Sequence, residues 1–387
     1  MKWGKITLIK HLQYSNKPDI LMIGPYPPPY GGIANVVKNL SSEKTLCKNF
    51  NIEIFRTGKT KESTQFPIQA IMDILQMMKY FLTIKNKEVQ IIHIHTASYW
   101  SFLRNVPYVI ISRYRTKKRI IVHIHGGEFK VFFEKASDPM KKIIRKTLTS
   151  VDCIFVTAPS WIDIIGKIIG DDENIYSIPN GYDETKFFLT SHEKARNNLH
   201  LPKNKKIILA VGSLEHHKGH HFLIESLSES TYSINNVISY IIGEGSLSKN
   251  LSQLIKNHNM TDKIVLVGGN KTPEEIALWM NAADIFVLPS LTEGNPTVMF
   301  ECLACGKPFV GTSVGGIPDI INSPEYGLLC KPGDVKDLTE KIQIALKKEW
   351  NHEKIIKYAE DFTWANIALK INKVYEKMIN DNRKRQT

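Results

Sequence analysis

Short apolar runs that end in a glycine or a polar loop recur along the chain, and each is followed by a segment with helical spacing. Examples are PDILMIG at 18–24, KIILAVG at 206–212 and DIFVLPS at 284–290. Buried parallel strands are near-continuous apolar runs, and a helix after each strand carries the chain back to the start of the next. The alternation therefore predicts an α/β fold with parallel sheets. With 387 residues the chain is too long for one ordinary core, so we expect two domains, each of fewer than about 200 residues.

The stretch from Pro289 to Gly316 has the strongest local signals, in the order strand, polar loop, helix, tight turn, strand and glycine loop. Asn295 is expected to cap the helix, Pro296 to be its first residue, and Gly306 to end it in a left-handed conformation. The start of such a helix presents unpaired N–H groups and the positive end of a dipole, which suit an anion such as a diphosphate.

Two acids bracket this helix start. Glu293 lies in the loop before the helix, and Glu301 lies about a turn and a half inside it. A ligand phosphate bound at the helix start would lie between these two carboxylates. Each carboxylate could then accept hydrogen bonds from a group of ligand hydroxyls on its own side of the phosphate. This arrangement is typical of a nucleotide-sugar site.

The stretch resembles the glutamate-x7-glutamate region of the family-4 retaining glycosyltransferases of bacterial surface-polysaccharide type. That family has the GT-B fold, in which two Rossmann-like α/β domains face each other across a cleft and the C-terminal helix crosses back to the first domain. The resemblance implies that Glu293 is a catalytic residue near the donor sugar and that Glu301 binds the donor ribose. It also implies a donor-binding role for the loop residues around the helix start, which are Gly294, Asn295, Pro296 and Thr297.

Two motifs in the first half extend the resemblance. Gly31 and Gly32 open a helical segment after the first strand, and they are similar to the family's GG loop, which faces the donor diphosphate and the acceptor. Their lack of a Cβ would let a ligand approach the backbone N–H groups closely. His125 ends a strand directly before two glycines, like the histidine of the family's HG loop, so it is expected to be a catalytic residue. The chain has no GxGxxG fingerprint for a dinucleotide.

Motifs in the second half complete the predicted donor site. Lys218 matches the family's diphosphate-binding lysine, whereas Ser213 stands where the family pattern has an arginine. A serine hydroxyl cannot replace the bidentate contacts of a guanidinium, so this departure leaves the activity in question. Gly243, Gly269 and Asn270 lie in loops after two further strands and are expected to bind the donor, the last two through the nucleotide base.

We predict neither a metal nor a cofactor. His93 and His95 share one strand face, as do His123 and His125, which would suit a zinc cluster. No carboxylate or cysteine stands beside them at ligand spacing, so a zinc site is not expected. Cys302 and Cys305 form a single CxxC inside a predicted helix, and the five scattered cysteines are expected to be reduced thiols. The sequence also lacks the Asp-x-Asp motif that metal-dependent transferases of the other common fold use.

The net charge of +13 is concentrated in the first half: residues 1–190 hold 27 Lys and Arg against 16 Asp and Glu. Aromatic residues lie beside cations in 67–87 and 98–119, a combination that suits the headgroup region of an anionic membrane. We therefore consider peripheral membrane contact through the basic N-terminal domain. Nucleic acid is not expected as a partner, because no RRM, KH or helix-turn-helix signature accompanies the charge.

The expected domains are an acceptor-side domain at 1–188, a nucleotide-sugar domain at 189–363 and a returning C-terminal helix at 364–387, with a polar linker near 185–203. No apolar window of about 18 residues is present, and Lys2, Lys5 and Lys10 interrupt any signal-peptide core. The chain is accordingly expected in the cytoplasm, including the inner face of the plasma membrane.

The resemblance implies a retaining, metal-independent glycosyltransferase that moves a sugar from a nucleotide-diphosphate donor to a saccharide. The family favours a UDP-sugar and a lipid-linked acceptor in the synthesis of a surface or capsular polysaccharide. Three alternatives stay open: a nucleotide-sugar epimerase of the same fold class, a non-catalytic subunit that binds a nucleotide-sugar, and a basic nucleic-acid binder.

Overall fold

A computed structural model describes residues 9–10, 17–29, 31–58, 66–229 and 236–384. The chain divides into two compact units, of which one comprises residues 1–180 with 364–387 and the other comprises residues 181–363. The sequence placed the first boundary between residues 188 and 189, whereas the structure places it between Asn180 and Gly181. Each unit contains a predominantly parallel sheet, so the predicted α/β class is confirmed.

The sheet of the first unit has the strand order β1-β3-β2-β4-β5-β6-β7. All neighbouring pairs are parallel except β1 with β3, which pair antiparallel at the edge. The winding direction reverses between β2 and β4, where ligands bind in open parallel sheets. The strands are β1 (Ile9–Lys10), β2 (Asp19–Gly24), β3 (Asn51–Arg56), β4 (Val89–Thr96), β5 (Arg119–Ile124), β6 (Cys153–Val156) and β7 (Ile175–Ser177).

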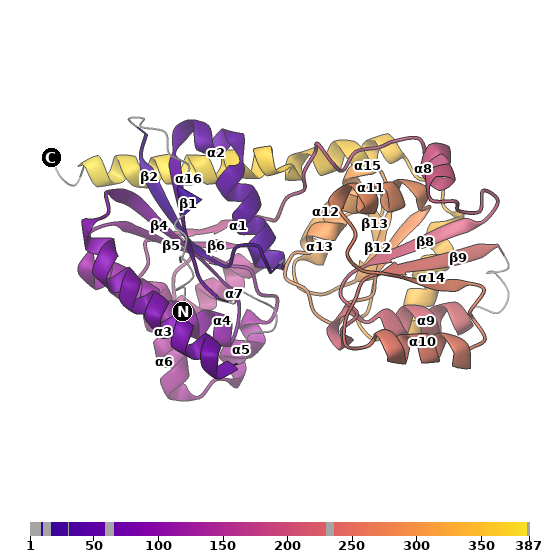
Figure 1. The fold of residues 1–387 in the computed structure, drawn as a ribbon, viewed down its shortest axis with the longest axis horizontal. Coiled ribbons are helices and arrows are strands. Elements are labelled where there is room, and N and C mark those ends of the chain that lie inside the picture. The colour runs from indigo at the N-terminus through magenta and orange to yellow at the C-terminus, as the bar shows by residue number, and fades with distance from the viewer. Residues whose placement is uncertain (1–8, 11–16, 30, 59–65, 230–235, 385–387) are drawn as a thin grey trace, which may run out of the picture. The chain divides into compact units, whose positions relative to one another are not determined.

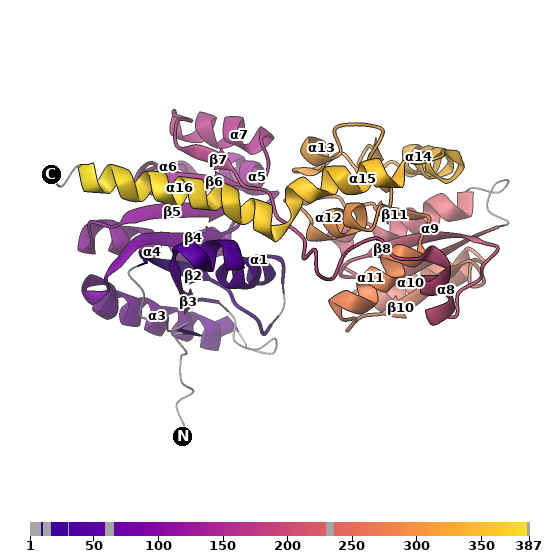
Figure 2. The ribbon, with the colours of Figure 1, turned by 90° about the horizontal axis from the view of Figure 1, so that it is seen from above.

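Helices cover both faces of this sheet. One buried cluster joins the sheet to α3, α4, α5, α6 and α7, and a second joins it to α1, α2 and the C-terminal helix α16. Figure 2 shows α16 in yellow across the sheet, and Ile367, Ile371 and Tyr375 of α16 are fully buried. The predicted return of the last helix to the first unit is therefore confirmed. The helices are α1 (Gly32–Ser42), α2 (Lys44–Asn49), α3 (Phe66–Thr83), α4 (Trp100–Arg115), α5 (Phe129–Lys135), α6 (Asp138–Thr149), α7 (Ser160–Ile169) and α16 (Trp364–Lys384), with the 3-10 turn η1 (Ile84–Asn86).

The second unit has a fully parallel sheet in the order β10-β9-β8-β11-β12-β13. This is the order of a dinucleotide-binding Rossmann fold, and its winding direction reverses between β8 and β11. The strands are β8 (Lys206–Val211), β9 (Val237–Ile242), β10 (Ile264–Gly268), β11 (Ile285–Leu288), β12 (Phe309–Thr312) and β13 (Gly327–Cys330).

Two helical layers enclose this second sheet (Figure 1). One core lies between the sheet and α11, α12 and α15, and the other lies between the sheet and α9, α10 and α14. The helices are α8 (His192–Asn198), α9 (His220–Glu229), α10 (Ser248–Asn257), α11 (Pro273–Ala282), α12 (Thr297–Ala304), α13 (Ile317–Ile320), α14 (Val335–Lys347) and α15 (His352–Ala359), with the 3-10 turns η2 (His216–Lys218) and η3 (Glu360–Phe362).

The predicted start of α12 was one residue early. The helix begins at Thr297, and Pro296 is the capping residue, with φ −69° and ψ 123° and no capping bond from its side chain. Proline has no N–H to donate and accepts an extended ψ as readily as a helical one, so it can stand just outside a helix. Gly306 follows the helix with φ +68°, as predicted.

The polar linker predicted near 185–203 contains the short helix α8 (His192–Asn198). Ser191 caps α8 by accepting a hydrogen bond from the backbone N–H of Lys194. Arg196, which is buried, fixes the helix to the second unit by donating to Asp284 at 2.7 Å and to the carbonyl of Ala282 at 3.0 Å. The sequence around this helix is polar and has no apolar helical pattern, because the side chain that fixes the helix to the second unit is a charged one.

We predict that Tyr375→Phe destabilises the first unit by about 1–3 kcal/mol, because the fully buried His93 would lose the partner of its Nδ1. The Oη of Tyr375 lies 2.6 Å from that nitrogen. Chemical denaturation measures the change, and Tyr326→Phe in the second unit is the control. Equal stability of Tyr375→Phe and wild type would show that this hydrogen bond is not needed.

Candidate functional site

The second unit gathers the predicted donor residues at the carboxyl edge of its sheet. Ser213 and Lys218 follow β8, Gly243 follows β9, Gly269 and Asn270 follow β10, and the loop with Glu293 follows β11. Because all of these strands are parallel, the loops that follow them converge at one edge. The structure therefore brings the donor-site predictions of this unit to one edge of the sheet, on loops from four strands.

Lys218 and Glu293 form the central contact of this edge. The Nζ of Lys218 lies 2.7 Å from Oε1 of Glu293, and Ser290 donates its hydroxyl proton to the same oxygen, also at 2.7 Å. Ser290 is fully buried and Glu293 nearly so, whereas a fifth of the Lys218 side chain is exposed. The contact joins the loops after β8 and β11, where the winding of the sheet reverses.

Glycines let the surrounding loops pack backbone against backbone. Gly219 has φ +67°, and a Cβ there would lie 2.0 Å from the carbonyl oxygen of Pro289. Gly315 has φ +56°, and its Cβ would lie 1.8 Å from the carbonyl oxygen of Glu293. Neither position can carry another residue without moving a loop, so the glycines fix the position of the Lys218–Glu293 pair.

Glu301 lies in the second turn of α12, half-buried. Removal of its carboxyl from water raises its pKa to about 7. A ligand whose hydroxyl groups donate to this carboxyl would favour its carboxylate form. Perturbed carboxyls of this kind are common at binding and catalytic sites.

The loops after β9 and β10 are joined by Glu244. Its Oε1 accepts the backbone N–H of Gly269 at 3.3 Å and contacts Nδ2 of Asn270 at 3.5 Å. A Cβ on Gly243 would lie 1.9 Å from the carbonyl of Gly212, which keeps the loops after β8 and β9 in contact. Ser213, next to Gly212, is exposed at this edge.

The first unit positions its own candidates at the carboxyl edge of its sheet. Gly31 and Gly32 are exposed at the start of α1, and a Cβ on either would have no atom within 4 Å. Their backbone therefore faces open space, as a ligand-facing loop requires. His125 directly follows β5, and its backbone N–H donates to the carbonyl of Thr96 on β4 at 2.8 Å.

A stack of four histidines lies beneath this edge. His95 and His123 are paired in the register of β4 and β5, and Nδ1 of His95 lies 3.0 Å from Nε2 of His125. The ring centroids of His123 and His125 are 4.0 Å apart, and those of His93 and His95 are 4.2 Å apart. Burial lowers the pKa of His93 and of His125 to about 3, and burial with neighbouring imidazoles holds the pKa of His95 and of His123 well below 6.5. All four rings are therefore neutral at physiological pH.

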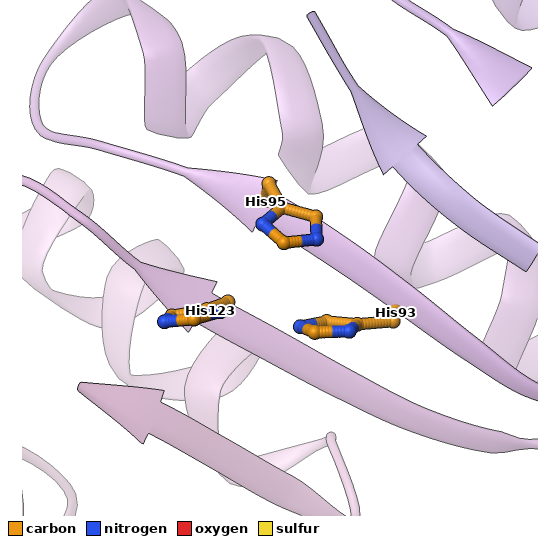
Figure 3. Close-up of side chains that lie close together, drawn as sticks. All are labelled: His93, His95 and His123. Carbon is orange, nitrogen blue, oxygen red and sulfur yellow. The ribbon is translucent and has the colours of Figure 1, made fainter. Parts of the chain in front are cut away.

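Figure 3 draws His93, His95 and His123, whose ligand nitrogens all lie within 4.8 Å of one another. The distances would admit a transition-metal ion, but the ring orientations argue against one. The rings of His93 and His123 are nearly parallel, with an interplanar angle of 9°. Imidazole binds metal along a lone pair in the plane of the ring, and a tetrahedral site needs those directions to converge. The cluster thus favours stacking over ligation, and the absence of a metal stays a prediction.

Comparison with known families covers most of the chain. Residues 191–362 match the family model described as "Glycosyl transferases group 1", and residues 52–186 match the model described as "Glycosyltransferase Family 4". The chain belongs to the family-4 glycosyltransferases. The two matched regions of the glycosyltransferase fall mainly in the second and the first unit, respectively.

Individual relatives agree with this assignment. The chain is 22% identical to N-acetyl-alpha-D-glucosaminyl L-malate synthase of Bacillus anthracis, over 77% of each protein. It is 28% identical to the putative teichuronic acid biosynthesis glycosyltransferase TuaC of Bacillus subtilis, over 61% of this chain and 56% of TuaC. Among solved structures, Anabaena Alr3699/HepE in complex with UDP superposes with a TM-score of 0.74 at 17% identity, over 93% of this chain and 100% of that one. The GT-B fold predicted for this glycosyltransferase is thereby confirmed.

Sequence reasoning missed two side chains that support the candidate site of this glycosyltransferase. Ser290 holds Glu293, and the signal for it was a serine at the end of an apolar strand, directly before the glutamate loop. His95 contacts His125, and the signal was the repeated HIH pattern on two strands that pair in parallel.

We predict that the glycosyltransferase loses stability as the pH falls from about 6.5 towards 3, and that His123→Gln makes this loss shallower. The four imidazoles have lowered pKa values when folded and take up protons when unfolded. The buried neutral imidazoles therefore contribute their full stability above about pH 6.5, the pKa of histidine in the unfolded chain. Below that pH the free energy of unfolding falls by about 1.4 kcal/mol per pH unit for each such group.

Urea unfolding at pH 7, 6 and 5 measures the slope, with His258→Gln, at an exposed position, as the matched control. If His123→Gln and wild type gave the same slope, uptake of protons by the stack would not be the cause.

Proposed function

We propose that the chain transfers a sugar with retention of anomeric configuration from a UDP-sugar to a saccharide acceptor. The observation that carries this proposal is the Lys218–Glu293 contact at the reversal point of a Rossmann-order sheet, in a chain of the family-4 glycosyltransferases. The structural neighbour Alr3699/HepE, solved with UDP, supports the choice of base.

Each donor-site residue has a proposed role. Lys218 donates to the diphosphate, because its ammonium has three protons and Glu293 accepts only one of them. The N-terminus of α12, which begins at Thr297 directly after Pro296, places the backbone N–H groups of its first turn and its dipole near the same phosphates. Glu301 accepts hydrogen bonds from the ribose hydroxyls. Gly269 and Asn270 read the base through the loop after β10.

The reaction breaks the bond between the sugar C1 and the diphosphate oxygen and forms a bond from C1 to the acceptor oxygen. The acceptor proton passes to the departing diphosphate, so no protein nucleophile is assigned. Fixed positive groups that stabilise the developing charge of the leaving group lower the barrier most. Glu293 orients the sugar. His125 of the first unit is neutral, because burial lowers its pKa to about 3, so in its proposed catalytic role it is an uncharged hydrogen-bonding group.

We further propose a lipid-linked saccharide acceptor in the synthesis of a surface polysaccharide, at the inner face of the plasma membrane. The name of the relative TuaC, a putative teichuronic acid biosynthesis glycosyltransferase, supports a polymer pathway. No helix in the described part of the chain has the length and apolar character to cross a bilayer. We propose that the chain meets this acceptor by peripheral contact of its basic first unit with the membrane surface.

We predict that the affinity for UDP-glucose rises by up to about tenfold between pH 6 and pH 8. The pKa of Glu301 is raised to about 7, and its carboxylate accepts hydrogen bonds from the ribose better than the neutral acid does. UDP-glucose is the ligand of choice because its diphosphate does not titrate in this range. Calorimetric titration at both pH values, on wild type and Glu301→Gln, tests this. A rise of equal size in the Gln variant would assign the dependence to another group.

The proposed donor class predicts that one nucleoside diphosphate out of a panel binds selectively without added metal, and that Glu301→Ala weakens its binding at least tenfold, in line with the loss of charge-assisted hydrogen bonds. Calorimetry with UDP, GDP and ADP measures this, and Glu353→Ala on α15 is the matched control. If no diphosphate bound to the wild type, the donor assignment would fail.

A second candidate, a non-catalytic subunit that binds a nucleotide-sugar, is favoured by one observation. Ser213 is exposed at the donor edge where the family pattern has an arginine, so a bidentate phosphate contact is missing. Turnover assays on wild type and Ser213→Arg separate the two. Turnover by the wild type supports the transferase, whereas turnover only in Ser213→Arg supports the non-catalytic subunit.

A further inference from the structure

Helix α3 has an unusual polarity: its inner side carries glutamines beside the core residue Tyr80, and its exposed side chains within 69–83 are large and apolar. Gln69, Gln76 and Tyr80 are nearly or fully buried, and they lie on one side of the helix at helical spacing. Gln69 donates to Asp73 on the same side at 2.9 Å, and Tyr80 shares a hydrogen bond of 2.6 Å with Ser112 of α4. A water-facing helix on a globular domain normally has the opposite arrangement.

The opposite side of α3, here called the outer face, is apolar. Six of its large hydrophobic side chains are between 41% and 68% exposed: Ile71, Ile74, Leu75, Met78, Phe81 and Leu82. At 100° per residue these positions fall within one third of the helix circumference. A continuous exposed apolar surface of this kind marks an interaction site, since single exposed hydrophobic residues would be scattered.

Helix α4 extends the outer face. Tyr114, which is 77% exposed, and Ile110 are on neighbouring turns of α4. The guanidinium of Arg115 on α4 lies 4.2 Å from the centre of the Phe81 ring, so the two helices present one surface. Tyrosine, phenylalanine and arginine in this arrangement suit the headgroup region of a membrane, where rings lie between hydrocarbon and water.

The charge beside the outer face is positive. Arg113, Arg115 and Lys117 are exposed at the end of α4, and Lys85 is exposed just after α3. No aspartate or glutamate occurs among the exposed positions of α3 within the described part of the helix, and Asp73 is on its inner side. An apolar face bordered by cations complements an anionic lipid surface, at which each well-placed cation strengthens binding about fivefold.

We propose that the outer face of α3, with the exposed end of α4, rests on an anionic bilayer as an interfacial surface. The helix lies in the plane of the headgroups, with its apolar side chains in the acyl boundary and the basic residues among the lipid phosphates. This deepens the membrane contact of the proposed function by assigning it to particular residues. It requires neither a donor nor turnover.

Flotation with vesicles tests the assignment. The lipids are phosphatidylcholine alone or with about 30% phosphatidylglycerol, at low and high salt. Wild type should bind the anionic vesicles, and Ile74→Ser with Leu82→Ser should weaken binding at least about tenfold. The matched control is Ile344→Ser with Leu189→Ser, which removes two exposed apolar side chains from the second unit and should bind as wild type does.

A charge variant gives an independent measurement. Lys85→Glu with Lys117→Glu should abolish the preference for anionic lipid, since both exposed cations become anions. The proposal is overturned if the outer-face pair and its control lose binding equally, or if neither loses any. It is also overturned if ultracentrifugation shows a dimer that only the outer-face variant dissociates, because a second copy would then cover the face. UDP calorimetry on the same variants tests the donor site independently. Loss of membrane binding with unchanged UDP binding concerns the outer face alone, and loss of UDP binding concerns the donor assignment.

Discussion

The candidate donor site depends on two loops that come within hydrogen-bonding distance at the point where the second sheet reverses its winding. Strands β8 and β11 are neighbours in space but far apart in sequence, and the chain leaves them for helices on opposite sides of the sheet. Lys218 and Glu293 join the two loops by an ion pair of 2.7 Å, and Ser290 donates a hydrogen bond to the same carboxylate oxygen. The glycines at 219 and 315 permit the approach, since any side chain there would collide with a backbone carbonyl. The backbone therefore fixes the positions of these charged residues, as the proposed binding of a diphosphate requires of a preorganised site.

Much of this could be predicted from the sequence, because strand ends and glycine loops are local signals. The apolar runs located the strands, and the positions of Lys218, Gly243 and Glu293 after separate runs predicted that they share an edge. The helix inside the linker could not be predicted in this way. It is held by Arg196, whose partner Asp284 is 88 positions away in sequence. The start of α12 was misplaced because proline is compatible with either side of a helix boundary. The contact between Ser290 and Glu293 depends on side-chain direction, and a sequence pattern does not specify that direction.

Polarity in this protein repeatedly runs against the usual rule of apolar inside and polar outside. Four neutral imidazoles lie within the first sheet's core region, and α3 turns its glutamines inward and its leucines outward. These departures have different physical consequences. The imidazoles are stable in the interior only while unprotonated, so they make folding sensitive to acid. The exposed apolar side chains cost free energy in water that a lipid surface or another partner would recover. The stability of the first unit therefore depends on the pH of the solution, and the free energy of its exposed apolar surface depends on what that surface contacts.

The last helix of the chain completes the core of the first unit, and this has a consequence for synthesis. Trp364, Ile371 and Tyr375 of α16 belong to the same buried cluster as Ile20 and Met22 of β2. During synthesis, residues 1–180 therefore emerge with one face of their sheet covered only in part, by α1 and α2, while residues 181–363 can bury both faces of their sheet without α16. Domains usually fold in the order in which they emerge. Here the second unit can complete its core before the first unit does, because the first unit needs α16, which follows the second unit in sequence.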